Sequence, residues 1–136
     1  MVKDDCIFCK LANGVFPTNT VYEDEDFRVF LDLSPATKGH SLIVPKNHCA
    51  NLLDLDEVTG SKIMPLASKI AKKLKDKLGC EGLNLVQNNG ELAGQTVFHF
   101  HMHVIPRYAG DSQSINWKPG TPDDGELEKI LDTINS

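Results

Sequence analysis

Three histidines stand at every second position of one short apolar run, His-Phe-His-Met-His at residues 99–103. Successive side chains of a β-strand point to opposite faces, so a strand over Val97–Pro106 would place His99, His101 and His103 on one face. The other face would then be apolar: Phe98, Phe100, Met102 and Val104. Imidazole can be a nucleophile, a proton carrier or a metal ligand near neutral pH. We therefore expect this face to carry chemistry.

A Cys-x-x-Cys pair, Cys6 and Cys9, lies near the start of the chain. A redox dithiol usually follows a strand and opens a helix, and no strand is expected before Cys6, so metal binding is favoured. Zinc prefers thiolates and imidazoles in a closed tetrahedron. His48 and one of the three histidines would complete such a set, although spacing alone does not say which one. The distance along the chain from Cys9 to His48 excludes a zinc finger.

Two further segments offer groups that bind a phosphorylated ligand. The polar loop Asn88–Thr96 contains glycines, amides and a hydroxyl, which can present N–H donors to a phosphate or an oxyanion. Asp32 shares a strand face with Phe30 and offers a carboxylate to hydroxyl groups beside an aromatic wall. The sequence has no P-loop and no dinucleotide-binding motif, so any nucleotide must be held without them.

The whole chain has the size and composition of a single domain over residues 1–136, with 40% hydrophobic and 24% charged residues. A net charge of −5 without a basic cluster argues against a nucleic-acid partner. No stretch approaches the roughly 20 apolar residues of a membrane span. The polar, acidic start has no signal-peptide core, so we expect a soluble cytoplasmic protein.

The clearest predicted element is one long amphipathic helix that ends at Gly79, with a kink or break near Pro65. Its apolar stripe recurs at helical spacing: Ile63, Leu66, Ala67, Ile70, Ala71, Leu74 and Leu78. Helical segments are also expected over residues 7–12 and about 123–134, and strands over Thr20–Glu23, Phe27–Asp32, Ser41–Val44, Leu83–Gln87 and Val97–Pro106. The sequence thus predicts an α+β fold: about five mostly antiparallel strands, one long helix and short flanking helices. Residues 1–15 would form a metal-clamped segment, and residues 109–136 a C-terminal tail.

Three segments together resemble the histidine triad (HIT) superfamily. The run Gly94–Ile105, with its His-x-His-x-His core, resembles the family signature, and Asp32–Pro35 with Gly39–His48 resembles its strand-turn-strand core. With Cys6-Ile7-Phe8-Cys9, the likeness extends over residues 6–108. The cysteines point to small zinc-containing bacterial-type proteins, similar to the histidine triad nucleotide-binding (Hint) branch.

The resemblance implies a role for each site residue. His101 would be the nucleophile that attacks the α-phosphorus of a nucleotide, and water would then release AMP or GMP from the nucleotidyl-histidine. His103 would contact phosphate and serve as a candidate proton donor, with His40 as a supporting histidine. The implied substrate-binding residues are Asp32 for the ribose, Asn88, Thr96 and Gln95 near the phosphate, and Ile7, Phe8, Leu11, Phe30 and Leu33 around the base.

The resemblance also assigns a metal and partners. A structural Zn²⁺ would be bound by Cys6, Cys9, His48 and His99. The expected partners are a purine nucleotide and a second copy of the chain, which would pair through the long helix and a sheet edge.

Four functions compete at this point. The leading one is a nucleotide phosphoramidase or nucleotidyl hydrolase that acts on a phosphoramidate or a related phosphoanhydride. A dinucleoside polyphosphate hydrolase is suggested by Pro106-Arg107 and Ala109-Gly110-Asp111, which resemble the fragile histidine triad branch. The others are a zinc-stabilised nucleotide-binding module with little turnover and a metalloenzyme with all three histidines on one ion.

Overall fold

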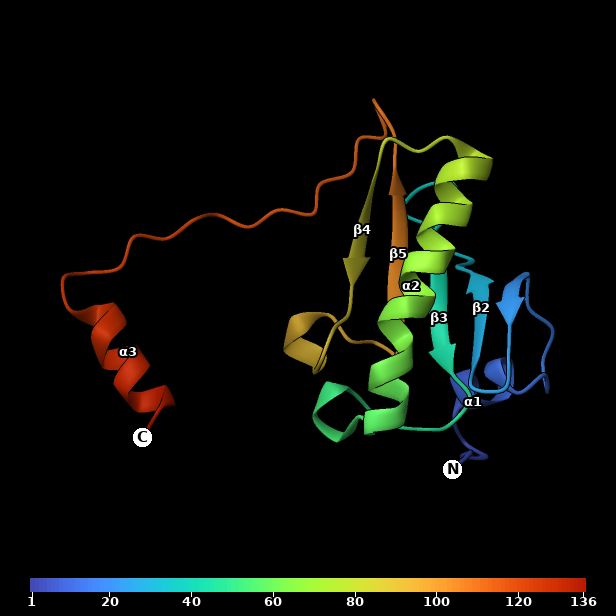
Figure 1. The fold of residues 1–136 in the computed structure, drawn as a ribbon, viewed down its shortest axis with the longest axis horizontal. Helices are drawn as coiled ribbons and strands as arrows, with labels where there is room; N and C mark the ends of the chain where they lie inside the picture. Colours follow the sequence, from blue (N-terminus) through green and yellow to red (C-terminus); the bar gives the residue numbers. More distant parts are fainter.

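The computed structural model describes all 136 residues, and its centre is one five-stranded sheet in the order β1-β2-β3-β5-β4 (Figure 1). Every neighbouring pair of strands is antiparallel. The elements in chain order are α1 (Ile7–Ala12), β1 (Thr20–Glu23), β2 (Phe27–Leu31), β3 (Ser41–Pro45), η1 (Leu52–Asp54), α2 (Glu57–Leu78), β4 (Gly82–Val86), η2 (Glu91–Ala93), β5 (Met102–Arg107) and α3 (Glu126–Ile134). The predicted α+β fold is confirmed.

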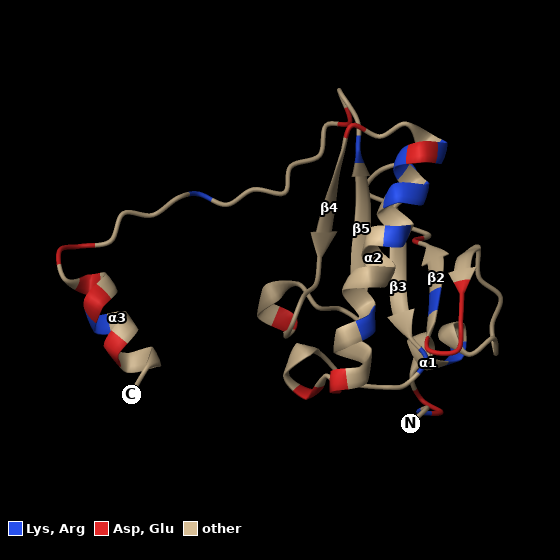
Figure 2. Cartoon of the chain, in the orientation of Figure 1, with Lys and Arg blue, Asp and Glu red and all other residues tan.

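The long helix α2 crosses one face of the sheet (Figure 1). The carboxylate of Asp56 accepts the Thr59 N–H at 2.9 Å at the start of the helix, and Gly79 ends it in the left-handed conformation. The buried residues of this layer form one core: Phe27, Val29, Ile43, Cys49, Ile63, Leu66, Ala67, Ile70, Leu74, Phe100 and Val104. The lysines of α2 lie on its exposed side (Figure 2), as expected of a solvated helix face.

Of the predicted kink or break near Pro65, the break is wrong, because α2 runs as one 22-residue helix through Pro65. Pro65 lies on the exposed side, where the Ser61 carbonyl that loses its helical partner can face water. The buried Ile63, Leu66 and Ala67 on either side of Pro65 hold both halves of the helix against the sheet.

The histidine segment is also less regular than predicted, because β5 begins only at Met102. Before that point the backbone bonds to the chain that follows β3, since the Phe100 N–H donates to the Cys49 carbonyl at 2.7 Å. Only His103 lies on the strand, whereas His99 and His101 lie in the irregular segment that precedes it. Phe98, expected in the core, is 50% exposed. Because this segment is not a regular strand, His99 and His101 need not lie on one face and can have different surroundings.

The C-terminal tail leaves the body of the molecule and ends in α3 (Figure 1). Residues 112–125 have no regular structure, and the apolar side chains of α3 are exposed: Leu127, Ile130, Leu131 and Ile134. The predicted terminal helix is confirmed, three residues shorter at its start. No helix of the molecule is both long enough and apolar enough to cross a membrane.

Candidate active site and metal site

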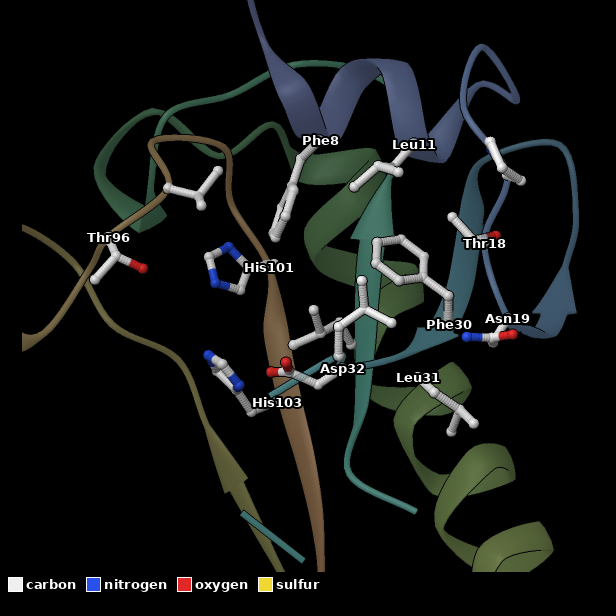
Figure 3. A pocket seen from close by; sticks show the side chains of 14 residues that line it. Phe8, Leu11, Thr18, Asn19, Phe30, Leu31, Asp32, Thr96, His101 and His103 are labelled. Atoms are coloured by element: carbon white, nitrogen blue, oxygen red, sulfur yellow. The ribbon is translucent and has the colours of Figure 1, made fainter. Parts of the chain in front are cut away.

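A pocket of about 490 Å³ opens on the sheet face opposite α2, between α1 and the histidine segment (Figure 3). One end is apolar, with Phe8 from α1 and Phe30 from β2 set edge to face, their ring centroids 6.1 Å apart. The other end is polar, with His101, His103 and Asp32. The complete lining is Phe8, Leu11, Pro17, Thr18, Asn19, Phe30, Leu31, Asp32, Leu33, Leu42, Thr96, Val97, His101 and His103.

Most of the residues predicted to bind substrate line this pocket, but three do not. Gln95 is only 3% exposed, and its side chain bonds to Gly90, Ala50 and Val97, so it holds the loop in place. Asn88 lies 3.5 Å from the Gly94 carbonyl, outside the pocket lining. Ile7 lines a second, smaller hollow together with Cys6 and His48. The pocket does not depend on these three side chains for its walls.

Several lining residues were not predicted from the sequence. Pro17, Thr18 and Asn19 come from the loop before β1, which has no periodic pattern that would signal a pocket. Leu31 and Leu42 lie on strands that were predicted, next to residues already assigned to the site. Only the folded arrangement of α1, β2 and β3 brings these side chains to one cavity.

The ring of His101 has a fixed arrangement of its two nitrogens. Its Nδ1 lies 2.6 Å from the backbone carbonyl of His99, and because a carbonyl only accepts, Nδ1 carries the hydrogen. The lone pair of the neutral ring is therefore on Nε2. Burial lowers the pKa of His101 below its usual range, while the His99 carbonyl opposes this, so the ring is neutral at pH 7. A neutral imidazole with a free Nε2 is a nucleophile.

Next to His101, three titratable groups form a second cluster. His40 Nε2 lies 2.9 Å from His103 Nδ1 and 3.5 Å from Asp32 Oδ2. Burial is the main cause that lowers the pKa of His103 to about 4, and the neighbouring His101 and His40 rings lower it further. Burial also lowers the pKa of His40, against the opposing charge of Asp32. At neutral pH this end of the pocket therefore presents neutral imidazoles beside one carboxylate.

On the other side of His101, four sulfur and nitrogen donors converge. His99 Nδ1 lies 3.3 Å from Cys6 Sγ and 3.4 Å from Cys9 Sγ, and His48 Nδ1 lies 3.5 Å from Cys9 Sγ. All four donor atoms lie within 4.8 Å of one another. A zinc tetrahedron with the usual bond lengths has sulfur-to-nitrogen edges of about 3.5 Å. The donor set therefore fits zinc.

The surroundings of these four donors support the same conclusion. The Nε2–H of His99 donates to the Pro45 carbonyl at 2.8 Å, which leaves Nδ1 free for a metal. Burial lowers the pKa of His99 to about 4, so the ring carries no competing proton. The Cys9 N–H donates to Cys6 Sγ, and the Lys3 N–H donates to Cys9 Sγ. His101 and His103 are not part of this group, so the three histidines do not converge on one ion.

Comparison with known proteins agrees with this geometry. The HIT domain family model matches residues 13–110. The Bacillus subtilis protein hit is 45% identical over 134 residues, which cover 96% of this chain and 92% of that protein. An adenosine 5′-monophosphoramidase of Schizosaccharomyces pombe is 40% identical over 102 residues, 75% of this chain and 74% of the other.

Among solved structures, a zinc-bound histidine triad family protein from Mycobacterium smegmatis superposes with a TM-score of 0.77 at 36% identity. The superposition covers 96% of each chain. The family model matches well over half of the sequence, and the sequence relatives cover most of it. The chain belongs to the HIT family.

Proposed function

We propose that this protein is a nucleotide hydrolase that cleaves a nucleoside monophosphate, AMP or GMP, from a phosphoramidate or a related phosphoanhydride. The observation that carries the proposal is the free Nε2 of His101 on the wall of a pocket with an apolar end and a carboxylate. The similarity to an adenosine 5′-monophosphoramidase supports the same reaction class.

In this mechanism His101 forms a covalent intermediate. Its Nε2 attacks the α-phosphorus, the bond from phosphorus to the leaving nitrogen breaks, and the electron pair stays on that nitrogen, which takes up a proton from solvent. Water then attacks phosphorus, the bond to Nε2 breaks with its pair returning to the ring, and the proton from water goes to solvent. Throughout, the His99 carbonyl holds the hydrogen on Nδ1 and stabilises the cationic ring of the intermediate.

The pocket explains how the nucleotide is oriented. Phe8, Leu11 and Phe30 offer flat apolar surface to a purine ring, and Asp32 offers a carboxylate to ribose hydroxyls. Thr96 and His103 face the phosphate at the polar end. An apolar pocket discriminates weakly between similar rings, so this arrangement fits adenine and guanine alike.

We further propose that Cys6, Cys9, His48 and His99 bind a structural Zn²⁺. The ion would join α1, through Cys9 and the N-cap residue Cys6, to His48 in the loop after β3 and to His99 in the histidine segment. With four protein donors it would have no open position for substrate. Its contribution is then to stability and to the placement of the His99 carbonyl, with no direct part in the reaction.

The decisive experiment is to trap the intermediate. After rapid mixing of the protein with an adenosine phosphoramidate and acid quench, mass spectrometry is expected to find an adenylyl group on His101. Turnover without an adduct on any histidine would contradict the mechanism, and nucleotide binding without turnover would favour a binding module. Faster turnover of a diadenosine polyphosphate than of the phosphoramidate would favour the dinucleoside polyphosphate hydrolase.

A homodimer is part of the same proposal. β4 has a neighbour only on the β5 side, so the backbone groups along its other edge are free to pair with a second copy. Sedimentation equilibrium is expected to give twice the chain mass, and a monomer at micromolar concentration would contradict this part.

A further inference from the structure

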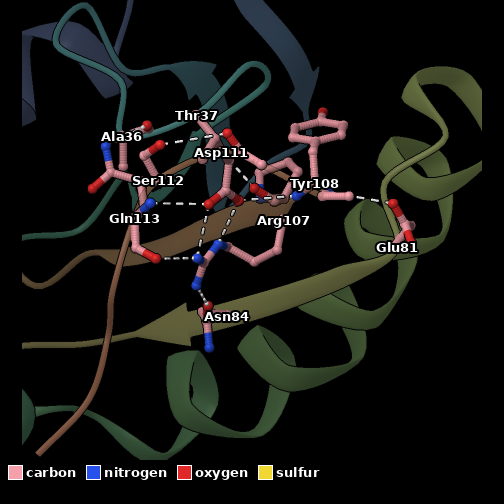
Figure 4. Close-up of polar contacts among 12 residues, drawn as sticks. Ala36, Thr37, Glu81, Asn84, Arg107, Tyr108, Asp111, Ser112 and Gln113 are labelled. Carbon is pink, nitrogen blue, oxygen red and sulfur yellow. Dashed lines mark hydrogen bonds and ion pairs between the residues drawn. The ribbon is translucent and has the colours of Figure 1, made fainter.

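The last residue of β5, Arg107, and the turn that follows it form a closed network of hydrogen bonds and one ion pair around Asp111 (Figure 4). We call residues 107–113 the Asp111 turn. The Asp111 carboxylate accepts from Arg107 Nε at 2.8 Å and from Arg107 Nη2 at 3.0 Å. It also accepts the backbone N–H groups of Tyr108 at 2.9 Å and Gln113 at 3.0 Å. Arg107 Nη2 in turn donates to the Gln113 carbonyl at 2.6 Å, so the turn closes on itself.

The end of β5 and the Asp111 turn are joined to the loop between β2 and β3 by three hydrogen bonds. Thr37 Oγ1 donates to the Pro106 carbonyl at 2.5 Å, Tyr108 Oη donates to the Lys38 carbonyl at 2.7 Å, and Gln113 Nε2 donates to the Ala36 carbonyl at 3.0 Å. The loop ends at His40, which is buried and lies 2.9 Å from His103 of the pocket lining. The position of the Ala36 backbone is thus set from the far end of β5.

The Ala36 backbone in turn fixes the hydrogen on His40. Its N–H donates to His40 Nδ1 at 2.9 Å, and because a backbone N–H can only donate, Nδ1 is without a hydrogen. The hydrogen of the neutral ring is then on Nε2, which faces His103 Nδ1 at 2.9 Å, closer than Asp32. His103 Nδ1 accepts, so His103 carries its own hydrogen on Nε2, the only ring nitrogen left to donate into the pocket.

We propose that Asp111 and Gln113 are positioning residues for the reaction, and that they act through Ala36 and His40 to keep the hydrogen of His103 on Nε2. This inference rests on the proposed function, because it gives that N–H the role of stabilising the charge that develops on the leaving atom. The donation is a hydrogen bond and moves no proton.

Two variants test the proposal, Asp111→Asn and Gln113→Ala, with Asp26→Asn as the matched control. Asp26 pairs with Lys62 at 2.7 Å on the surface and has no connection to His40, so it controls for the loss of a carboxylate ion pair. Gln113→Ala removes one exposed hydrogen bond, so this variant is expected to fold even if Asp111→Asn destabilises the turn.

The first readout is the tautomer, measured by two-dimensional ¹H–¹⁵N NMR of the imidazoles. The parent and Asp26→Asn are expected to show His40 and His103 with hydrogen on Nε2 only, and the two test variants to show averaged nitrogen shifts. Unchanged shifts in both test variants would overturn the proposal. This readout needs no turnover, so it stands apart from any failure of the proposed function.

The second readout is the dependence on the leaving group. An alkylamine leaving group needs the hydrogen bond more than a nitrophenolate does, so kcat is expected to fall about tenfold with an adenosine alkylphosphoramidate and less than twofold with a nitrophenyl ester of AMP. KM should not change. Equal losses with both substrates would show a general structural role and overturn the proposal.

Discussion

His99 and His101 are two residues apart, and each donates a ring N–H to a backbone carbonyl, but they use opposite nitrogens. His99 donates from Nε2 to Pro45, which leaves Nδ1 facing two cysteine sulfurs. His101 donates from Nδ1 to His99, which leaves Nε2 for the pocket. In the proposed function, the same side chain is thereby prepared for a metal in one case and for a nucleophilic attack in the other.

Under the proposed function, the backbone carbonyl partner, more than the residue type, determines which role each histidine takes. Both rings are buried, and burial lowers the pKa of each, so both are neutral. What differs is the surroundings of the free nitrogen: sulfur on one side, and a pocket with a carboxylate on the other. The following experiments test this division, in order of decreasing effect.

Replacement of His101 by alanine should have the largest effect. We expect a loss of phosphoramidate turnover of about a thousandfold or more, because no other group at the pocket has a free nucleophilic nitrogen held in this way. Metal content and AMP binding, measured by elemental analysis and calorimetry, should stay close to those of the parent. Full activity in this variant would show that His101 is not the nucleophile.

Replacement of Cys9 by serine should affect the proposed metal site. We expect loss of bound zinc and a fall in melting temperature of roughly 10 °C, because metal binding contributes directly to folding free energy. Cys80→Ser is the matched control, since Cys80 is buried but lies outside the four-donor group. Undiminished metal in Cys9→Ser would contradict the assignment.

Asp32→Asn tests the proposed contact between the Asp32 carboxylate and the ribose hydroxyls. Loss of the carboxylate should raise KM for a ribonucleotide substrate about tenfold, which corresponds to roughly 1.4 kcal/mol of lost hydrogen bonding. The same change should have little effect on a 2′,3′-dideoxy substrate, which lacks the hydroxyls. Steady-state kinetics with both substrates provide the test. Equal effects on both would show that Asp32 does not bind the ribose hydroxyls.

The smallest effect concerns acid stability. The pKa of His103 is about 4 in the folded protein and near 6.5 in an unfolded chain, so between these values only the unfolded chain binds the proton. Stability should therefore fall by about 1 kcal/mol from this residue as the pH is lowered from 6.5 to 5.5. Urea unfolding of the parent and of His103→Gln isolates the contribution, because the metal site is common to both. Parallel curves for the two proteins would contradict it.

Local patterns in the sequence were enough to predict most of the elements. The apolar stripe of α2 and the strand predicted over Phe27–Asp32 depend on residues close in sequence. Both agree with the structure, in which β2 ends one residue earlier, at Leu31. The start of β5 was missed because the Phe100 N–H bonds to Cys49, a contact between residues far apart in the chain. Helix α2 continues through Pro65 because of packing against the sheet, which propensity does not include.

The candidate site was predicted in type but not in arrangement. The residue types and the family resemblance named the four metal donors, and the structure brings those donors together. Gln95 was expected to contact substrate because it is polar and next to Thr96, yet its side chain is used to close its own loop. The tautomers of His99 and His101 depend on carbonyl groups whose positions no sequence pattern encodes.

The tail that ends in α3 has a thermodynamic consequence for the rest of the molecule. A helix of nine residues is marginal in water on its own, so its helical content depends on whether its apolar face is covered. The tether of residues 112–125 can span up to about 45 Å and keeps α3 at a local concentration on the order of millimolar. At that concentration even a contact with millimolar affinity would be half occupied, so backbone amide exchange in α3 measures how often its face is covered.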